Sequence, residues 1–256
     1  MANLPAHGRV PCTRCLLDRE VEFDVSKRTE GSWRITSNPL AWGNQKAEVV
    51  VLGFSKGPTQ AGALTTIHHD LIAFKGSRHN VGKILIHVGL LKRNTTKTIS
   101  EVIDDIVSDT TGRFHFGSLI RCTVERYDKV ANGWKGSGGG MLDKFIATPF
   151  GTEVASNCCG QFLGELPKET KLIIMFGLGS KLNYVVSAKR LFEKARGTRF
   201  AQINSVAYTD GKITVVHVEH FASQGALIPN WLGENKHERA LLGIMARDAV
   251  QLAIKK

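Results

Sequence analysis

Four short apolar runs, rich in β-branched residues, constrain the fold of this chain most. They are AEVVVLG at 47–53, FHFGSLIR at 114–121, KLIIMF at 171–176 and KITVVHVE at 212–219. Runs that stay apolar at nearly every position are typical of strands buried on both faces, as in parallel sheets. The sequence therefore predicts four such strands.

The segments between and after these runs have a helical pattern. Apolar residues recur at helical spacing within 80–92, 180–196 and 234–254. This alternation predicts an α/β fold, a three-layer sandwich with a central, mainly parallel four-stranded sheet flanked by helices. The loops at the carboxyl ends of such strands form the usual site, and here they read GFSKGPTQ, SLIRC, FGLGS and HFASQ.

The chain, 1–256, is interpreted as a single domain with one irregular segment. The stretch at about 127–151 contains NGWKGSGGG, and its glycine content predicts a flexible insertion. GSGGG lacks the Lys-Ser/Thr pair of a phosphate-binding loop, so we interpret it as a linker.

Composition excludes several classes of protein. With 256 residues, 42% hydrophobic and 22% charged, the chain is neither collagen, coiled coil nor long disorder. No apolar run approaches the ~20 residues that span a bilayer. The first residues, MANLPAHGRVPC, contain no apolar signal core. These features predict a cytoplasmic protein that does not contact a membrane.

The charge balance indicates a nucleic-acid partner. Lys and Arg total 34 against 23 Asp and Glu, so the net charge is +11. The excess is spread over folded segments and forms no tail, as expected of a surface that follows a phosphate backbone. It predicts DNA or RNA binding, with a solvated lysine face as the alternative.

Five cysteines occupy three places. Cys12 and Cys15 form a CxxC, Cys122 ends an apolar run, and Cys158 and Cys159 lie in a helical segment. Two thiolates at CxxC spacing can face one metal, so the set predicts metal or cluster ligation. A redox pair and buried free thiols are the alternatives.

Short motifs in a fixed order now add to this picture. After the CxxC come a glycine-rich turn at 53–58 (GFSKGP), FKG at 74–76 and SLIRC at 118–122. CGQFLGEL from Cys159 and HFAS from His220 follow. In this order the chain resembles the uracil-DNA glycosylase superfamily, closest to its iron–sulfur branch, family 4. The resemblance spans roughly 12–225.

The resemblance implies a structural 4Fe–4S cluster and a base-flipping site. The implied cluster ligands are Cys12, Cys15, Cys122 and Cys159, with Cys158 spare. The implied catalytic residues are His220, which stabilises the leaving base, and Ser55, which positions water. The implied base-binding residues are Phe54, Phe74, Ser118 and Asn80. The implied DNA contacts are Lys56, Ser223, Leu227 and Ile228, the last two as apolar wedges.

Several positions depart from the family pattern. The first motif has Phe54-Ser55-Lys56 where relatives carry a water-orienting Glu, Asp or Asn. Asp70 and Glu219 are nearby carboxylates that can substitute. Ser118 replaces a base-reading Asn, Phe221 replaces a Pro, and the last two implied ligands lie 159 − 122 = 37 positions apart.

The smaller Ser118 leaves room for a larger base. The resemblance implies a monofunctional DNA glycosylase, expected to be a monomer. With Ser118, the expected base is uracil or a modified pyrimidine such as a hypermodified phage cytosine. Its role would be DNA repair or anti-phage defence. A non-catalytic DNA- or damage-binding protein on the same fold is the alternative, because the first motif lacks a carboxylate. A zinc-bound nucleic-acid module is a third reading.

Overall fold

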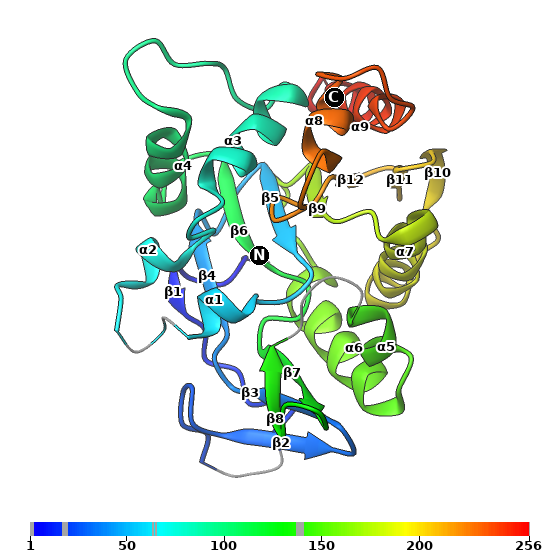
Figure 1. Ribbon diagram of the computed structural model, residues 1–256. Coiled ribbons are helices and arrows are strands. Elements are labelled where there is room, and N and C mark those ends of the chain that lie inside the picture. The colour runs from blue at the N-terminus through cyan, green and yellow to red at the C-terminus, as the bar shows by residue number, and fades with distance from the viewer. Residues whose placement is uncertain (1–2, 17–19, 63, 65, 137–140, 256) are drawn as a thin grey trace.

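The computed structural model describes residues 3–16, 20–62, 64, 66–136 and 141–255. Its main element is an eight-stranded mixed sheet of order β1-β4-β6-β5-β9-β12-β11-β10 (Figure 1). Its strands are β1 (Gly8–Arg9), β4 (Leu40–Gly43), β5 (Val49–Gly53), β6 (Phe114–Ser118), β9 (Leu172–Phe176), β10 (Ala201–Asn204), β11 (Ala207–Thr209) and β12 (Thr214–Val218). The α/β prediction is confirmed.

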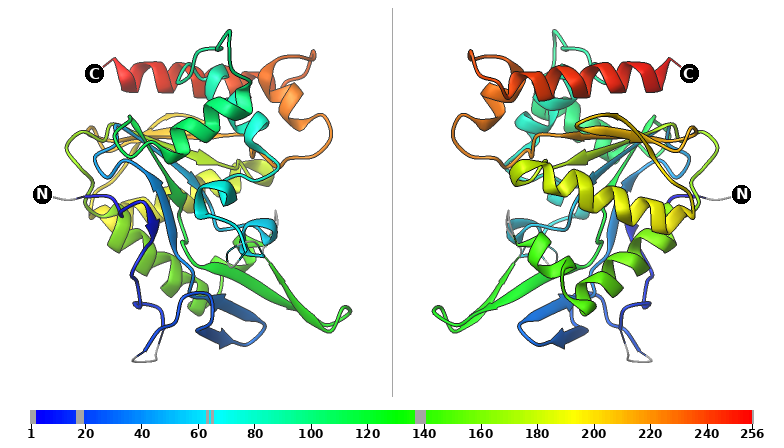
Figure 2. Two further views of the ribbon diagram at one scale, coloured as in Figure 1. Left: turned by 90° about the vertical axis from the view of Figure 1, so that its left-hand side faces the viewer. Right: turned by 90° about the vertical axis from the view of Figure 1, so that its right-hand side faces the viewer.

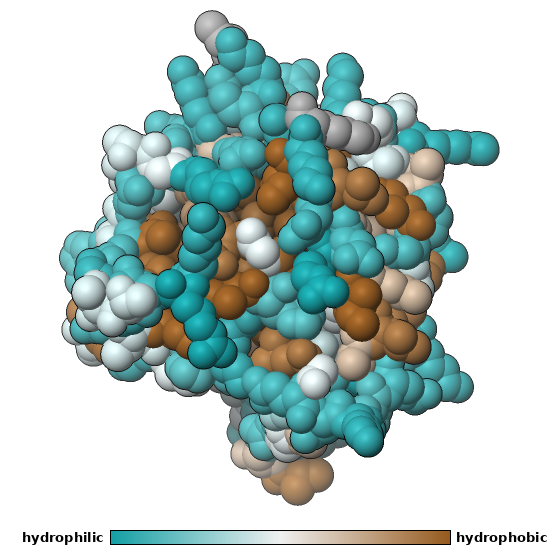
Figure 3. All heavy atoms as spheres, turned by 90° about the horizontal axis from the view of Figure 1, so that it is seen from above, coloured by the Kyte–Doolittle hydropathy of each residue, from teal (hydrophilic) through white to brown (hydrophobic). Residues whose placement is uncertain are grey.

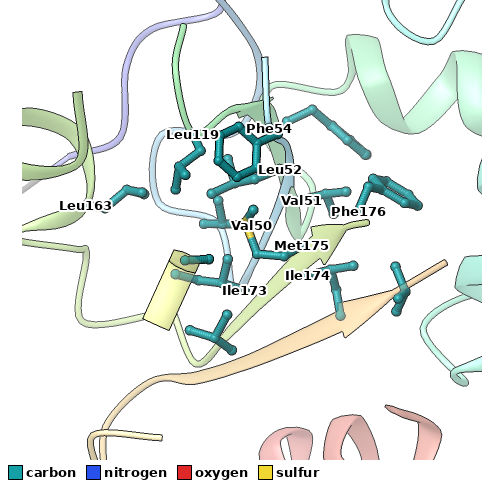
Figure 4. Packing of buried hydrophobic residues seen from close by; sticks show 14 of the residues in the cluster. Val50, Val51, Leu52, Phe54, Leu119, Leu163, Ile173, Ile174, Met175 and Phe176 are labelled. Atoms are coloured by element: carbon teal, nitrogen blue, oxygen red, sulfur yellow. The ribbon is translucent and has the colours of Figure 1, made fainter. Parts of the chain in front are cut away.

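The four predicted runs form β5, β6, β9 and β12, and neighbours among them pair in parallel. The predicted four-stranded sheet is too small, because antiparallel β4 and β1 extend one edge and β11 and β10 the other. These edge strands have two to four residues and carry almost no periodicity. Figure 4 shows the side chains of β5 and β9 interleaved, with every residue of both strands buried.

Helices lie on both faces of this sheet (Figure 2). One face carries α3 (Arg78–His87), α4 (Ile99–Ser108), α8 (Leu227–Leu232) and α9 (Ala240–Ile254). The other face carries α6 (Pro149–Leu163) and α7 (Asn183–Arg196). Helix α5 (Leu142–Ile146) packs against α6 and α7. The three predicted helical segments contain α3, α7 and α9.

Capping side chains and a proline explain where two of the helices begin. Thr98 and Glu101 form a capping box at α4, and the Thr148 hydroxyl caps α6, where Pro149 takes the first turn. Short helices α1 (Pro58–Ala61), α2 (His69–Ile72) and the 3₁₀ turn η1 (Ser180–Leu182) lie in the loops after strands. None of the helices in the described ranges is both long and apolar enough to cross a membrane.

A second, antiparallel sheet has the order β2-β3-β7-β8. Its strands are β2 (Lys27–Glu30), β3 (Trp33–Thr36), β7 (Thr123–Asp128) and β8 (Gly133–Gly136). The β7–β8 hairpin projects from the body of the molecule (Figure 2). The expected flexible insertion at 127–151 therefore includes part of this hairpin, α5 and the start of α6. The glycine run at 137–140 lies outside the described residues.

The face seen from above in Figure 3 is mostly hydrophilic, with hydrophobic patches between the polar side chains. On α9, Leu241, Ile244 and Leu252 are exposed, while Ala246, Ala249 and Val250 are buried. The buried side of α9 contacts β12, so this helix covers the strand that leads to His220.

Candidate functional site

The carboxyl ends of β5, β6, β9 and β12 meet at one edge of the sheet. Gly53 and Ser118 are register partners at the ends of β5 and β6. Beyond them, the amide of Leu119 donates to the Gly53 carbonyl and that of Ile120 to the Phe54 carbonyl, each over 2.9 Å. This backbone pairing holds the first motif beside Ser118, as the sequence predicted for loops at one end of a parallel sheet.

His220 follows β12 at the same edge. Its Nδ1 accepts a hydrogen bond from the Ala222 amide at 3.1 Å, and its ring stacks on Phe221 with centroids 4.4 Å apart. Burial lowers the pKa of His220, and the Glu219 charge opposes that shift. A neutral ring whose Nδ1 is an acceptor carries its proton on Nε2. The loop therefore prepares His220 as a neutral hydrogen-bond donor.

Glu219 is a structural anchor of this loop. Its carboxylate accepts from the His220 amide at 2.9 Å, from the Ser223 hydroxyl at 2.9 Å and from Arg239 Nε at 2.6 Å. With its oxygens so engaged and 3% of the residue exposed, Glu219 is not placed to activate water. The Ser223 hydroxyl, expected to contact DNA, donates to Glu219 instead.

An aromatic cluster lies under the His220 loop. The Phe74 ring is edge-on to Phe116, Phe176 and Phe221 at centroid distances of 5.8, 6.0 and 5.1 Å. Phe74 is buried and has a φ of 54°, which is strained for a side chain of this size. Its role in stacking on a base stays a prediction.

Phe54 is also buried and packs against Tyr184 at 5.3 Å. A Cβ added at Gly177 would lie 3.2 Å from Tyr184 and 3.9 Å from His220, so Gly177 brings these two rings to one place. Sequence reasoning missed Tyr184. The sequence signal was the position of Tyr184, an aromatic residue shortly after the FGLGS loop and near the start of the next helical segment.

Asn80 reaches the site from α3. Its Nδ2 donates to the Phe221 carbonyl at 3.0 Å, so this side chain holds the loop that carries His220. Ser55 is half-buried beside Gly53. Asp70 contacts His7 and His69, and its predicted role as a substitute base gains no support from these contacts.

Two predicted DNA contacts are wrong. Lys56 is only 2% exposed, and its Nζ donates to the Arg121 carbonyl, so it cannot meet a phosphate. Ile228 is 4% exposed and packs within α8, so it is not a free wedge. Leu227, at the start of α8, is 39% exposed and keeps that possibility. Both were expected from the family resemblance, and the packing of the fold buries them instead.

The CxxC lies along α6. Cys12 Sγ donates to Gln161 Oε1 at 3.4 Å, and Asn157 Nδ2 donates to Cys15 Sγ at 3.5 Å. The Cys15 and Cys158 thiols hydrogen-bond each other, which lowers the pKa of Cys15 to about 7 and raises that of Cys158. Cys122 interacts electrostatically with both Cys15 and Cys12. Cys12, Cys15 and Cys158 therefore lie along α6, and Cys122 is near enough to Cys15 and Cys12 to feel their charge.

Cys158, and not the expected ligand Cys159, is the neighbour of Cys15. Cys159 is fully buried, and burial alone raises its pKa to about 12, with no contribution from another thiol. Its charge is felt by Tyr208 of β11 instead. Adjacent helix residues point about 100° apart, so only one of the two can face Cys15, and that one is Cys158.

In the part of the chain that the structure describes, no three of the thiols bring their sulfurs within 4.8 Å of one another. Among the residues that the structure describes, only His7, His69 and Asp70 bring three ligand atoms within 4.8 Å of one another. His7 Nε2 lies 2.8 Å from Asp70 Oδ1, while the Gly43 amide donates to His7 Nδ1 at 3.1 Å. A neutral His7 then carries its proton on Nε2 and has no lone pair there for a metal.

Comparison with known proteins adds no relative: no protein-family model and no curated protein matches this chain.

Proposed function

We propose that this chain is a DNA glycosylase that flips a pyrimidine out of DNA and hydrolyses its N-glycosidic bond. The observation that carries the proposal is His220, held with Nδ1 as an acceptor so that Nε2–H can donate to a leaving base. Gly53 and Ser118 lie at the ends of β5 and β6, at the edge of the sheet where His220 follows β12. Tyr184 and His220 both lie close to Gly177.

In the reaction, the bond between C1′ of the sugar and the base nitrogen breaks, and its electron pair leaves with the base. His220 Nε2–H stabilises the charge that develops on the base oxygen. Water forms the new bond to C1′ and its proton balances the base anion, so the products are a free base and an abasic sugar. Ser55 is the residue of the first motif that can position this water.

The net charge of +11 supports a DNA substrate. Ser118, at the end of β6, supports a base larger than uracil, since a hydroxyl takes less space than an amide and reads one edge group only. A hypermodified cytosine of phage DNA is the substrate class that we propose, with uracil as the comparison.

We propose that the four thiols near α6 hold a 4Fe–4S cluster and not one metal ion, because no three of them in the described residues bring their sulfurs within 4.8 Å of one another, and each cysteine of such a cluster binds a different iron. Cys12, Cys15, Cys122 and Cys158 would hold it. Bound there, the cluster would tie the N-terminal segment to β6 and α6.

A second candidate is a non-catalytic DNA- or damage-binding protein. It is favoured by the absence of a carboxylate at 54–56 together with the full engagement of Glu219 by Arg239, Ser223 and the His220 amide. Such a protein would bind DNA and release no base.

Mass spectrometry of free bases separates the two. Uracil-containing, unmodified and hypermodified phage DNA are incubated with wild type, His220→Ala and His68→Ala. We expect base release by wild type and by His68→Ala, whose histidine is exposed just before α2, and release slowed roughly 10²–10³-fold in His220→Ala. No released base from any DNA, with DNA binding intact, would favour the second candidate.

A further inference from the structure

Two cations are buried beside the cysteines. Arg121 is 1% exposed and Lys56 2% exposed. Lys56 Nζ donates to the Arg121 carbonyl, and Arg121 Nη1 donates to the Leu40 carbonyl at 3.1 Å. Arg121 Nε and Nη2 are buried without a hydrogen-bond partner in the described ranges. Burying a charge with no opposite charge nearby costs free energy. We therefore expect an anionic group to compensate Lys56 and Arg121.

Carboxylates do not supply it. In the part of the chain that the structure describes, no ion pair joins Lys56 or Arg121 to Asp or Glu. Asp24 attracts Lys56 only weakly, and its Oδ1 accepts from Asn38 at 2.8 Å. The guanidinium of Arg121 instead lies over the Phe162 ring, 4.7 Å from its centroid. That ring is on α6, the helix that carries Cys158.

The titratable groups that act on both cations are cysteine thiols. Lys56 interacts electrostatically with Cys122 and Cys158, and Arg121 with Cys158 and Cys12. Cys158 is thus common to both cations and to Cys15. Neutral thiols would leave two buried positive charges uncompensated, whereas thiolates that hold a metal cluster form a net anion.

We propose that Lys56 and Arg121 are charge-balancing residues for an iron–sulfur cluster held by Cys12, Cys15, Cys122 and Cys158. This inference rests on the cluster of the proposed function and does not depend on glycosylase activity. Neither side chain is a ligand. Each acts through the field that it places on the thiolates and on the cluster that they carry.

Reduction adds one electron to the cluster, and the positive charges of Lys56 and Arg121 stabilise the more negative, reduced form. Removing one buried positive charge should therefore make reduction harder. Lys56→Met keeps the length of the side chain and removes its charge. Arg121→Gln removes the guanidinium charge, and Arg121→Lys retains a charge at the same place.

The experiment measures iron content and the reduction potential of the full-length protein, purified anaerobically, by redox titration with electron paramagnetic resonance. We expect Lys56→Met and Arg121→Gln to disfavour the reduced form about tenfold, which is about 59 mV for a one-electron couple. Arg121→Lys should stay near wild type. If Lys56 and Arg121 only supported the fold, the variants would change stability. The reduction potential would then not be lower in Lys56→Met and Arg121→Gln than in Arg121→Lys.

Cysteine variants test the ligand set in parallel. Cys158→Ser should lose iron, and Cys159→Ser, its matched neighbour, should retain it. Lys56→Met should fold even if Arg121→Gln does not, because replacing a buried charge by an apolar group of similar size is often neutral or stabilising.

Equal potentials in wild type and Lys56→Met would overturn the inference. So would full iron in Cys158→Ser, or a wild-type protein without iron. A wild type that binds iron with the expected potential shifts but releases no base would overturn the proposed glycosylase activity alone.

Discussion

Asn80 on α3 donates a hydrogen bond from Nδ2 to the carbonyl oxygen of Phe221, 141 positions further along the chain, at 3.0 Å. Phe221 stacks on His220 and packs edge-on against Phe74 and Phe176. One amide thus fixes the segment in which the proposed catalytic histidine and the aromatic cluster meet.

Asn80→Ala should therefore impair the site more than it impairs the fold. We expect base release to fall about tenfold, which is ~1.4 kcal/mol at the barrier, with a stability loss of about 1 kcal/mol. Asn204→Ala is the matched control, because Asn204 makes the same kind of bond to the Met245 carbonyl at 2.9 Å. Single-turnover kinetics and urea unfolding of both variants decide, and equal activity of the two would contradict a positioning role.

Glu219→Gln should release the His220 loop. Loss of the charge breaks a buried pair with Arg239, and we expect stability to fall by about 3 kcal/mol and base release to fall with it. Asp210→Asn is the control, since Asp210 pairs with Arg196 at 2.8 Å and its side chain is as buried as that of Glu219, 3% against 4% exposed. Asp210 precedes β12 and His220 follows it. The control should lose stability but keep its activity per folded molecule.

Acid should destabilise the protein through its buried histidines. Burial lowers the pKa of His217 to about 4, and Nδ1 and Nε2 lie 3.1 Å from the Gly177 carbonyl and the Tyr208 hydroxyl. The unfolded chain takes up this proton near pH 6.5, so the contribution of His217 is complete above that pH. It should be lost as the pH falls from about 6.5 to about 4, on the order of 3 kcal/mol.

Urea unfolding at several pH values measures this loss. His217→Asn should flatten the dependence in that window, whereas substitution of exposed His68 by Gln should leave it unchanged. An unaltered slope in His217→Asn would remove His217 from the acid response.

DNA affinity should fall with salt, with log K decreasing by about 0.9 per phosphate contact for each tenfold rise in salt. Because Lys56 is buried, Lys56→Met should keep the wild-type slope. Lys75, exposed next to Phe74, is the comparison, and Lys75→Met should reduce the slope by about one contact. Titration of a duplex at several salt concentrations checks both, and a flat profile for the wild type would argue against backbone tracking.

Ser118→Asn should shift base choice. It adds an amide beside Gly53, where the Ser118 Oγ now lies 4.0 Å from a Cβ built on that glycine. We expect release of uracil to rise and release of a larger pyrimidine to fall, because the amide fills space and offers both a donor and an acceptor. Single-turnover assays on both substrates check this. Parallel loss of both activities would indicate damage to the fold, and efficient, unchanged uracil release would show that Ser118 does not set base choice.

The sequence by itself determined the core of the fold and the edge at which its loops meet. Runs such as VVVLG and LIIMF are short, apolar throughout and rich in β-branched residues, which favours strands covered on both faces, so β5 and β9 were predictable. The alternation with helices then placed Gly53, Ser118 and His220 at one end of the sheet. Short edge strands such as β1 and β10 were not predictable, because two to four residues show no period.

Tertiary structure alone decided which side chains are buried and which way they face. Lys56 and Arg121 are charged, and local sequence predicts exposure for such residues. Both are buried because Arg121 lies over Phe162 of α6 and Lys56 donates to the Arg121 carbonyl, contacts between segments far apart in the chain. Cys158 and Cys159 are neighbours with the same chemistry. Which of them meets Cys15 depends on the rotation of α6 about its axis, and that rotation is fixed by contacts with segments distant in the chain.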